Sequence, residues 1–156
     1  HDPVGILLIR RGGYAVALAS QGTLTNHKLG SRYVQSRTAA GGWSQQRFAR
    51  RRANQADSLI EATAARALEV ILGGDADGTA TGRPAGLVIG GDRSLCASVL
   101  AEPRLRVLRP LPRRELPDLP DPNRRTLDEA VRRGRAVRIH VVDTASAERS
   151  SPGELA

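Results

Sequence analysis

Residues Val4–Ser20 have the sequence VGILLIRRGGYAVALAS, and this stretch decides the fold. Val4–Arg10 and Tyr14–Ser20 are rich in β-branched and apolar residues and are separated by Gly12-Gly13, a pattern typical of two β-strands. In the second of them bulky side chains alternate with alanines, which predicts that one face of the strand carries the bulk.

Further strands follow directly. Ser20-Gln21-Gly22 signals a turn, and Thr23–Lys28 predicts a third strand. Leu29-Gly30-Ser31 interrupts the pattern, and Arg32–Arg37 predicts a fourth strand. We therefore expect an antiparallel meander of three or four strands.

A helix must come next, because apolar residues recur with a period of 3.6 from Ala56 to Ile71. We expect it to begin near Gln46 and to end at Gly73-Gly74. The elements predicted after it are a loop over Asp75–Pro84, a strand over Ala85–Ile89, a tight turn at Gly90-Gly91-Asp92 and a helix through Leu100. A strand over Leu105–Leu108 and an extended connector over Pro110–Pro122 are predicted next. A short helix then opens with a Thr126–Glu129 capping box and ends at Gly134, and a last strand follows over Arg135–Val142.

The resulting order, β-β-β-(β)-α-β-α-β-α-β, predicts an α/β fold in which a mixed β-sheet is flanked by helices. We expect one domain over residues 1–144. The tail over residues 145–156 is rich in Ser, Glu, Pro and Gly, a composition typical of disorder.

The positive charge is concentrated in the first third of the chain. The net charge is +8, yet residues 3–55 contain nine cations and no Asp or Glu, whereas fifteen Arg and fifteen acids cancel from Asp57 onward. A one-sided field of this kind is typical of a surface that meets a polyanion, and it favours nucleic acid as a partner. The bland alternative is a compositional bias toward Arg, but that bias does not explain the missing acids.

Several kinds of site are disfavoured. The single cysteine, Cys96, excludes an internal disulfide and a cysteine-based zinc site, and it is interpreted as a core residue of a cytoplasmic protein. His27 and His140 fall in predicted strands without metal-ligand spacing. No apolar run of eighteen residues exists, so we expect no membrane span.

The segment Ala39–Arg52 carries the strongest functional signal. It combines Gly41-Gly42, which permit close backbone approach to a ligand, with Trp43, two glutamines and four arginines. Aromatic residues among arginines suit stacking on nucleotides and contact with phosphates. A glutamine cannot act as a base, but its amide can orient water and stabilise developing charge. The alternative is a helix start with a solvated basic face, against which Trp43 packs.

The run Gly-Gly-Trp-Ser-Gln-Gln-Arg-Phe-Ala-Arg-Arg-Arg over residues 41–52 resembles the Vms-like release factor family of actinobacterial type. This family is related to the middle domain of the eukaryotic class-one peptide-chain release factor and to the peptidyl-tRNA hydrolases of ribosome quality control. The resemblance extends through Gly86–Asp92 to about Asp143. It implies a ribonuclease H-like release-factor middle domain that hydrolyses the ester of peptidyl-tRNA on the large ribosomal subunit, without a cofactor or metal.

The resemblance also implies roles for individual residues. The Gly-x-Ser-Gln pattern of the quality-control members matches Gly42-Trp43-Ser44-Gln45 and makes Gln45 the catalytic glutamine. The Gly-Gly-Gln triplet of the class-one factor is broken here by Trp43, so Gln46 stays a second candidate. The basic side chains would then contact ribosomal or transfer RNA, and they are Arg47, Arg50, Arg51 and Arg52.

Two other functions stay open. The protein could be a nuclease that cuts the acceptor end of tRNA, or an RNA-binding module in which neither glutamine acts. In all three cases we expect a monomer whose loop over Thr38–Ser44 is ordered only when it docks on the ribosome.

Overall fold

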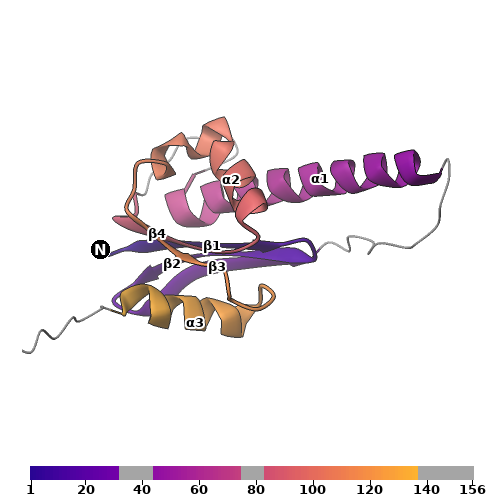
Figure 1. Cartoon of the computed structure of the whole chain (residues 1–156). Helices are drawn as coiled ribbons and strands as arrows, with labels where there is room; N and C mark the ends of the chain where they lie inside the picture. The colour runs from indigo at the N-terminus through magenta and orange to yellow at the C-terminus, as the bar shows by residue number, and fades with distance from the viewer. Residues whose placement is uncertain (32–43, 75–82, 137–156) are drawn as a thin grey trace, which may run out of the picture.

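A five-stranded mixed sheet forms the centre of the protein, with the strand order β3-β2-β1-β4-β5 (Figure 1). The computed structural model describes residues 1–31, 44–74 and 83–136. The strands are β1 (Val4–Arg10), β2 (Gly13–Ser20), β3 (Thr23–Ser31), β4 (Gly86–Gly91) and β5 (Arg113–Leu116). Strand β2 pairs antiparallel with β1 and β3, whereas β4 is parallel to both β1 and β5.

The hairpin of β1 and β2 is confirmed, with Arg10 opposite Gly13 at its closed end. The expected break at Leu29-Gly30-Ser31 is wrong, because β3 continues through these residues. Gly30 pairs with Tyr14, and a β-carbon on Gly30 would come within 2.4 Å of the tyrosine ring. The glycine therefore makes room for Tyr14 inside a continuous strand. The fourth strand predicted over Arg32–Arg37 lies outside the described residues.

Helices cover both faces of the sheet (Figure 1). They are α1 (Ser44–Leu72), α2 (Arg93–Ala101) and α3 (Arg124–Arg135), and a 3-10 helix, η1, spans Pro103–Leu108. Helices α1 and α2 lie on one face and α3 lies on the other. Helix α1 stops before Gly73, whose φ of 58° is left-handed, as the sequence predicted for this glycine pair.

Strand alternation divides the core into two clusters. Leu7 and Ile9 of β1 face α1 and α2, together with the bulky residues of β2, whereas Ile6 and Leu8 face α3 together with the alanines of β2. The bulky face predicted for β2 is thus the face that α1 covers. Cys96 belongs to the first cluster and is 4 % exposed, and its burial raises the pKa of the thiol to about 11.

The tight turn predicted after β4 is confirmed. Gly91 has a φ of 97°, and the carboxylate of Asp92 accepts hydrogen bonds from the backbone amides of Ser94 and Leu95 at 2.9 and 3.1 Å. Asp92 therefore caps α2 and directs it back over the sheet.

Several later predictions are wrong. Leu105–Leu108 belongs to η1 rather than to a strand, since Pro103 starts a 3-10 turn that buries Leu105 and Leu108. The connector over Pro110–Pro122 contains β5, which pairs with β4. These two assignments fail because neither the alternation of apolar residues nor the proline content of a segment shows which segments pair as strands in the sheet.

The predicted capping box of α3 is also wrong. Asn123 caps the helix by accepting a hydrogen bond from the amide of Thr126 at 2.9 Å. The Thr126 hydroxyl instead donates to the carbonyl of Asp121, and Glu129 binds Arg132. Arg135 is the last residue of α3, one position beyond the predicted end at Gly134, so the last strand does not begin there. Residues 137–142 of that strand, the proposed tail over residues 145–156 and His140 lie outside the described residues.

The predicted fold class is confirmed, because a five-stranded mixed sheet carries helices on both faces. Three antiparallel strands followed by two parallel ones are consistent with the ribonuclease H-like architecture that the resemblance implied.

Candidate nucleic-acid interface

The predicted site residues fall at the start of α1. The helix begins at Ser44, two residues earlier than expected, so Gln45 and Gln46 lie in its first turn rather than in a loop. Gln46 is exposed. Gly41, Gly42 and Trp43 lie outside the described residues. Of the loop predicted over Thr38–Ser44 only Ser44 is described, and it is the first residue of α1 rather than part of a loop.

The first half of α1 projects beyond the sheet (Figure 1). Leu59 is the first residue of the helix that is fully buried, and the positions described before it are exposed or half-buried. From Ser44 to Leu59 the helix rises by about 22 Å, at 1.5 Å per residue. We call residues 44–55 the arm. The arm has no apolar stripe, because most of its length has no sheet to pack against.

The four arginines of the arm are divided between two sides of the helix. Arg47, Arg50 and Arg51 are three and four residues apart, so they share one side, and all three are exposed. Arg52 follows Arg47 by five residues, which corresponds to about 140° around the axis. It is half-buried. The structure therefore brings together three of the predicted RNA-binding arginines and separates the fourth from them.

The charges of the arm are not neutralised by the described part of the protein. None of its four arginines forms an ion pair within residues 1–31, 44–74 and 83–136. Elsewhere in the described part seven of the fifteen arginines pair with carboxylates, and the pairs are Arg10–Asp121, Arg66–Glu69, Arg93–Glu115, Arg104–Glu102, Arg124–Asp128, Arg132–Glu129 and Arg133–Asp118. The pairing with Arg133 holds the pKa of Asp118 below its usual value, and Arg132 does the same for Glu129.

Helix polarity adds to this positive charge. The first turn of α1 contains no acidic residue, although anions are stabilising and cations destabilising at a helix amino terminus. Arg47, which lies in the first turn, therefore opposes the helix dipole. An arriving phosphate would meet both the dipole and the side chains favourably.

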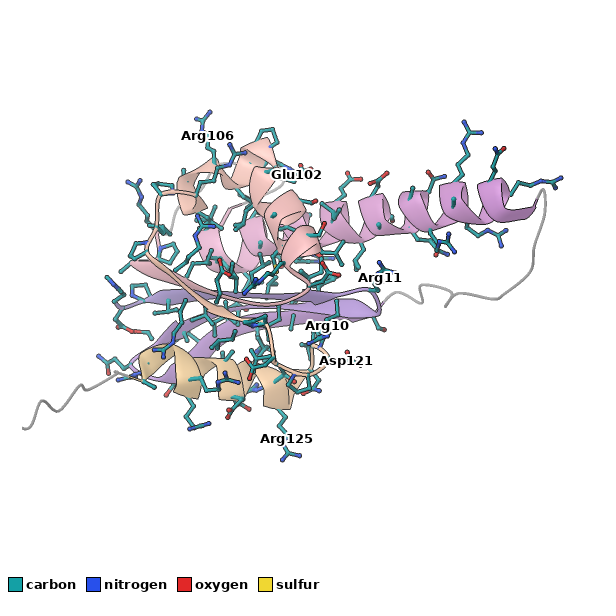
Figure 2. All side chains as sticks on the ribbon, in the orientation of Figure 1. Arg10, Arg11, Glu102, Arg106, Asp121 and Arg125 are labelled. Atoms are coloured by element: carbon teal, nitrogen blue, oxygen red, sulfur yellow. The ribbon has the colours of Figure 1, made fainter. Side chains whose placement is uncertain are left out.

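The carboxyl end of β1 collects more positive charge (Figure 2). Helices α1 and α3 begin at this end of the sheet, and α2 starts directly after β4, which is parallel to β1. Arg11 lies here, at the tip of the hairpin, and its side chain is exposed. Sequence reasoning did not select Arg11 as a site residue. The signal was the adjacent Arg10-Arg11 pair directly before Gly12-Gly13, where the hairpin was expected to turn.

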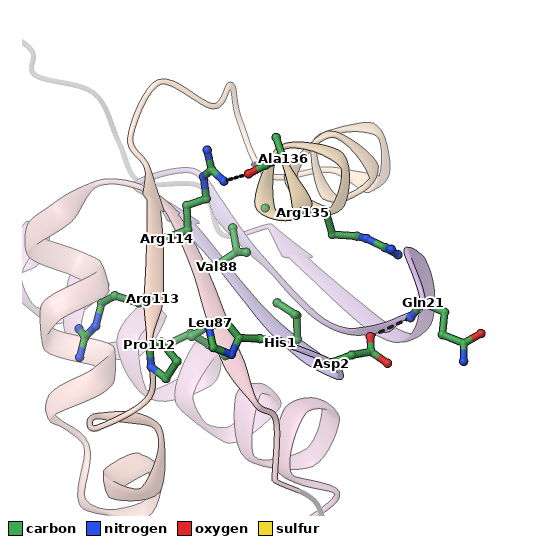
Figure 3. Close-up of a pocket in the computed structure, with 13 residues that line it drawn as sticks. His1, Asp2, Gln21, Leu87, Val88, Pro112, Arg113, Arg114, Arg135 and Ala136 are labelled. Carbon is green, nitrogen blue, oxygen red and sulfur yellow. Dashed lines mark hydrogen bonds between the residues drawn. The ribbon is translucent and has the colours of Figure 1, made fainter. Parts of the chain in front are cut away.

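A cavity lies at the opposite end of the sheet (Figure 3). It has a volume of about 650 Å³ and is lined by the amino ends of β1 and β4, by β5 and by the end of α3. Within it Arg114 donates a hydrogen bond to the carbonyl of Ala136. Hydrogen bonds from Gln21 and Ser20 hold the pKa of Asp2 below its usual value. None of the predicted site residues lines this cavity.

His27 lies in β3 as predicted and contacts α3. Its Nε2 atom is 3.3 Å from the guanidinium of Arg124, and the ring is half-buried. Among residues 1–31, 44–74 and 83–136, no group of three or more His, Cys, Asp or Glu side chains is placed to hold a metal ion. No helix in the same part of the chain is long and apolar enough to cross a membrane.

An α/β domain with an unpaired arginine arm at one end of its sheet has the electrostatic character of proteins that bind polyanions. The chain belongs to the family described as the Actinobacteria/chloroflexi VLRF1 release factor, whose sequence profile matches residues 2–140. No curated protein matches it. The family confirms the resemblance found in the sequence, and membership in a release-factor family implies interaction with the ribosome.

Proposed function

We propose that the protein is a peptidyl-tRNA hydrolase that releases nascent peptides from tRNA on stalled large ribosomal subunits. The observation that carries this proposal is the arm of α1, whose arginines have no acidic partner in the described part of the chain and which begins with the candidate glutamines. Membership in a release-factor family supports it. The arm extends about 22 Å beyond the first fully buried residue of α1, a length suited to entering a narrow site in a large RNA.

The proposed chemistry is hydrolysis of an ester. Water attacks the carbonyl carbon that joins the peptide to the 3′ end of tRNA, and the products are a peptide with a free carboxyl group and a tRNA with a free hydroxyl group. Gln45 positions the water or stabilises the oxyanion of the tetrahedral intermediate. Gly41 and Gly42 allow the backbone to approach the tRNA terminus, and Ser44 starts the helix that carries Gln45.

The remaining site residues bind RNA in this proposal. Trp43 stacks on a nucleotide, and the arginines contact phosphates of ribosomal or transfer RNA. The step needs neither a metal ion nor a cofactor. The protein acts as a monomer in the cytoplasm, where ribosomes stall.

Gln45 and Gln46 cannot play the same part. Adjacent positions of a helix are about 100° apart around its axis, so the two positions face different directions. We favour Gln45, because the Gly-x-Ser-Gln pattern places it there. This choice is testable because both residues lie in the first turn of α1, so that either one can be replaced while the other keeps its position.

The test uses isolated large subunits that carry stalled, labelled peptidyl-tRNA. We expect the wild-type protein to liberate the peptide and to leave tRNA of full length on a denaturing gel. A tRNA shortened at its 3′ end would contradict ester hydrolysis and establish the nuclease. Subunit binding without either product would leave the RNA-binding module as the function.

A further inference from the structure

Arg11 and Arg52 lie just beyond the end of the core, on the side where α1 and the sheet face each other. Leu59 of α1 and Ile9 of β1 are both fully buried and belong to the same core cluster. Arg52 precedes Leu59 by seven residues, or two helical turns, and so lies on the same side of the helix. Arg11 lies in the turn directly after β1, and its side chain projects on the α1 side of the sheet (Figure 2). Both therefore border the space between the arm and the carboxyl end of β1.

The two neighbouring arginines of the hairpin differ in their surroundings (Figure 2). Arg10 points to the α3 side, where its Nε donates to the carbonyl of Leu119 at 3.2 Å and lies 3.9 Å from Asp121. Arg11 has no ion pair with any described residue, and its side chain is exposed. Arg10 is thus held by the fold, whereas Arg11 is available to a partner on the α1 side.

Arg52 differs from the other arginines of the arm in its burial. Arg47, Arg50 and Arg51 are exposed on the outer side, but Arg52 is half-buried and forms no ion pair within the described ranges. A phosphate that approaches Arg52 from the side of Arg11 would accept charge-assisted hydrogen bonds from both guanidinium groups.

We propose that Arg11 and Arg52 form a phosphate-binding pair for the acceptor strand of the RNA substrate, separate from the outer face formed by Arg47, Arg50 and Arg51. This inference rests on the proposed function, because the choice of RNA as the ligand comes from that function. Arg52 and Gln45 are seven residues apart, which is about 10 Å along the helix. A phosphate held by the pair therefore fixes the RNA strand within a short distance of the turn that carries Gln45. Arg11 and Arg52 are positioning residues, and the outer arginines supply general affinity.

The test measures binding of one defined probe, a hairpin RNA that copies a tRNA acceptor stem with its single-stranded 3′ end. Arg11→Gln, Arg52→Gln and the double variant are compared with the wild type by fluorescence anisotropy. We expect each single change to weaken binding by about tenfold, because each removes hydrogen bonds to a charged group. The double variant should lose less than the product of the two effects, since both side chains hold one phosphate. Arg11→Lys and Arg52→Lys keep the charge and should restore part of the affinity.

Arg106→Gln is the matched control, because this exposed arginine lies on η1, on a different part of the molecule (Figure 2). Its affinity should equal that of the wild type. If the Arg11 and Arg52 variants bind the hairpin as tightly as Arg106→Gln does, the pair is not a phosphate site. Thermal unfolding checks that all variants are folded.

Peptide release by the same variants separates this inference from the proposed function. With saturating stalled subunits, the double variant should release peptide at least about tenfold more slowly than the wild type. If the wild type binds the hairpin through both arginines but releases no peptide, the hydrolase is refuted and the phosphate site stands. If the wild type releases peptide and the double variant equals it in both release rate and hairpin affinity, the pair is refuted and the hydrolase stands.

Discussion

Arg10 ties the end of β1 to the loop that precedes α3, because its Nε donates a hydrogen bond to the carbonyl of Leu119 at 3.2 Å. A second nitrogen of the same guanidinium bonds to that carbonyl and to the carbonyl of Pro117. Leu119 is 1 % exposed and packs in the core cluster beneath α3. One arginine of the hairpin is therefore structural, although its neighbour Arg11 is exposed at the tip.

This difference predicts opposite effects on stability. Arg10→Met removes hydrogen bonds from a charged donor to two carbonyls, and we expect it to lower the free energy of unfolding by about 1–3 kcal/mol. Arg11→Met removes no ion pair with the described residues and should stay within about 0.5 kcal/mol of the wild type. Urea denaturation measures both. Equal stability of the two variants would show that the Arg10 contacts contribute nothing in solution.

The start of α3 gives a second prediction. Asn123→Ala removes the side chain that caps the amide of Thr126, and it should lower the free energy of unfolding by about 0.5–2 kcal/mol. Glu129→Ala is the control, because Glu129 pairs with Arg132 at the surface and its loss should cost less stability than the loss of the Asn123 cap. A larger loss in Glu129→Ala than in Asn123→Ala would instead support the capping box.

The thiol of Cys96 provides a pH-dependent probe of the core. Burial raises its pKa to about 11, and the thiolate is the form that reacts with alkylating reagents. At pH 8 the folded protein should therefore react far more slowly than the same protein in denaturant, where the pKa of a cysteine is about 8.5. The reaction is followed with iodoacetamide and mass spectrometry. Equal rates in the two states would mean that Cys96 is accessible.

The α/β class and the central hairpin could be predicted because their signals are local. Strand β1 is a continuous apolar run, bulky side chains alternate with alanines in β2, and apolar residues recur along the packed half of α1. Gly91-Asp92 supplies its own turn and cap. Strand β5 could not be predicted in this way. Its residues Arg113–Leu116 are mostly charged, and only pairing with β4 makes them a strand.

The site was predictable in composition but not in shape. Arginines and glutamines near residue 45 were evident, yet the helical arm has no apolar stripe and so gave no periodic signal. The start at Ser44 was therefore missed by two residues. Arg11 was missed because it is thirty-three residues away from Ser44 in sequence, and only the packing of α1 over β1 brings their ends to one side.

Salt dependence tests the outer face of the arm. If Arg47 and Arg50 each contact a phosphate, the affinity for large subunits should fall with salt, and replacing both by Gln should flatten the log–log slope by about 1.4–1.8. Arg47 and Arg50 are exposed, so replacing them should leave stability unchanged, and Arg106→Gln serves as the surface control. An unchanged slope in the double variant would leave the outer face as a solvated surface.

The most direct measurement is the single-turnover rate of peptide release from stalled large subunits by Gln45→Ala. Loss of one hydrogen-bonding group that stabilises the transition state typically costs about 10²–10³ in rate. We expect a loss of this size in Gln45→Ala, a smaller one in Gln46→Ala, and subunit binding near that of the wild type in both. If Gln46→Ala is the inactive variant, the catalytic position is wrong by one residue. Release at the wild-type rate by both variants would contradict the glutamine mechanism.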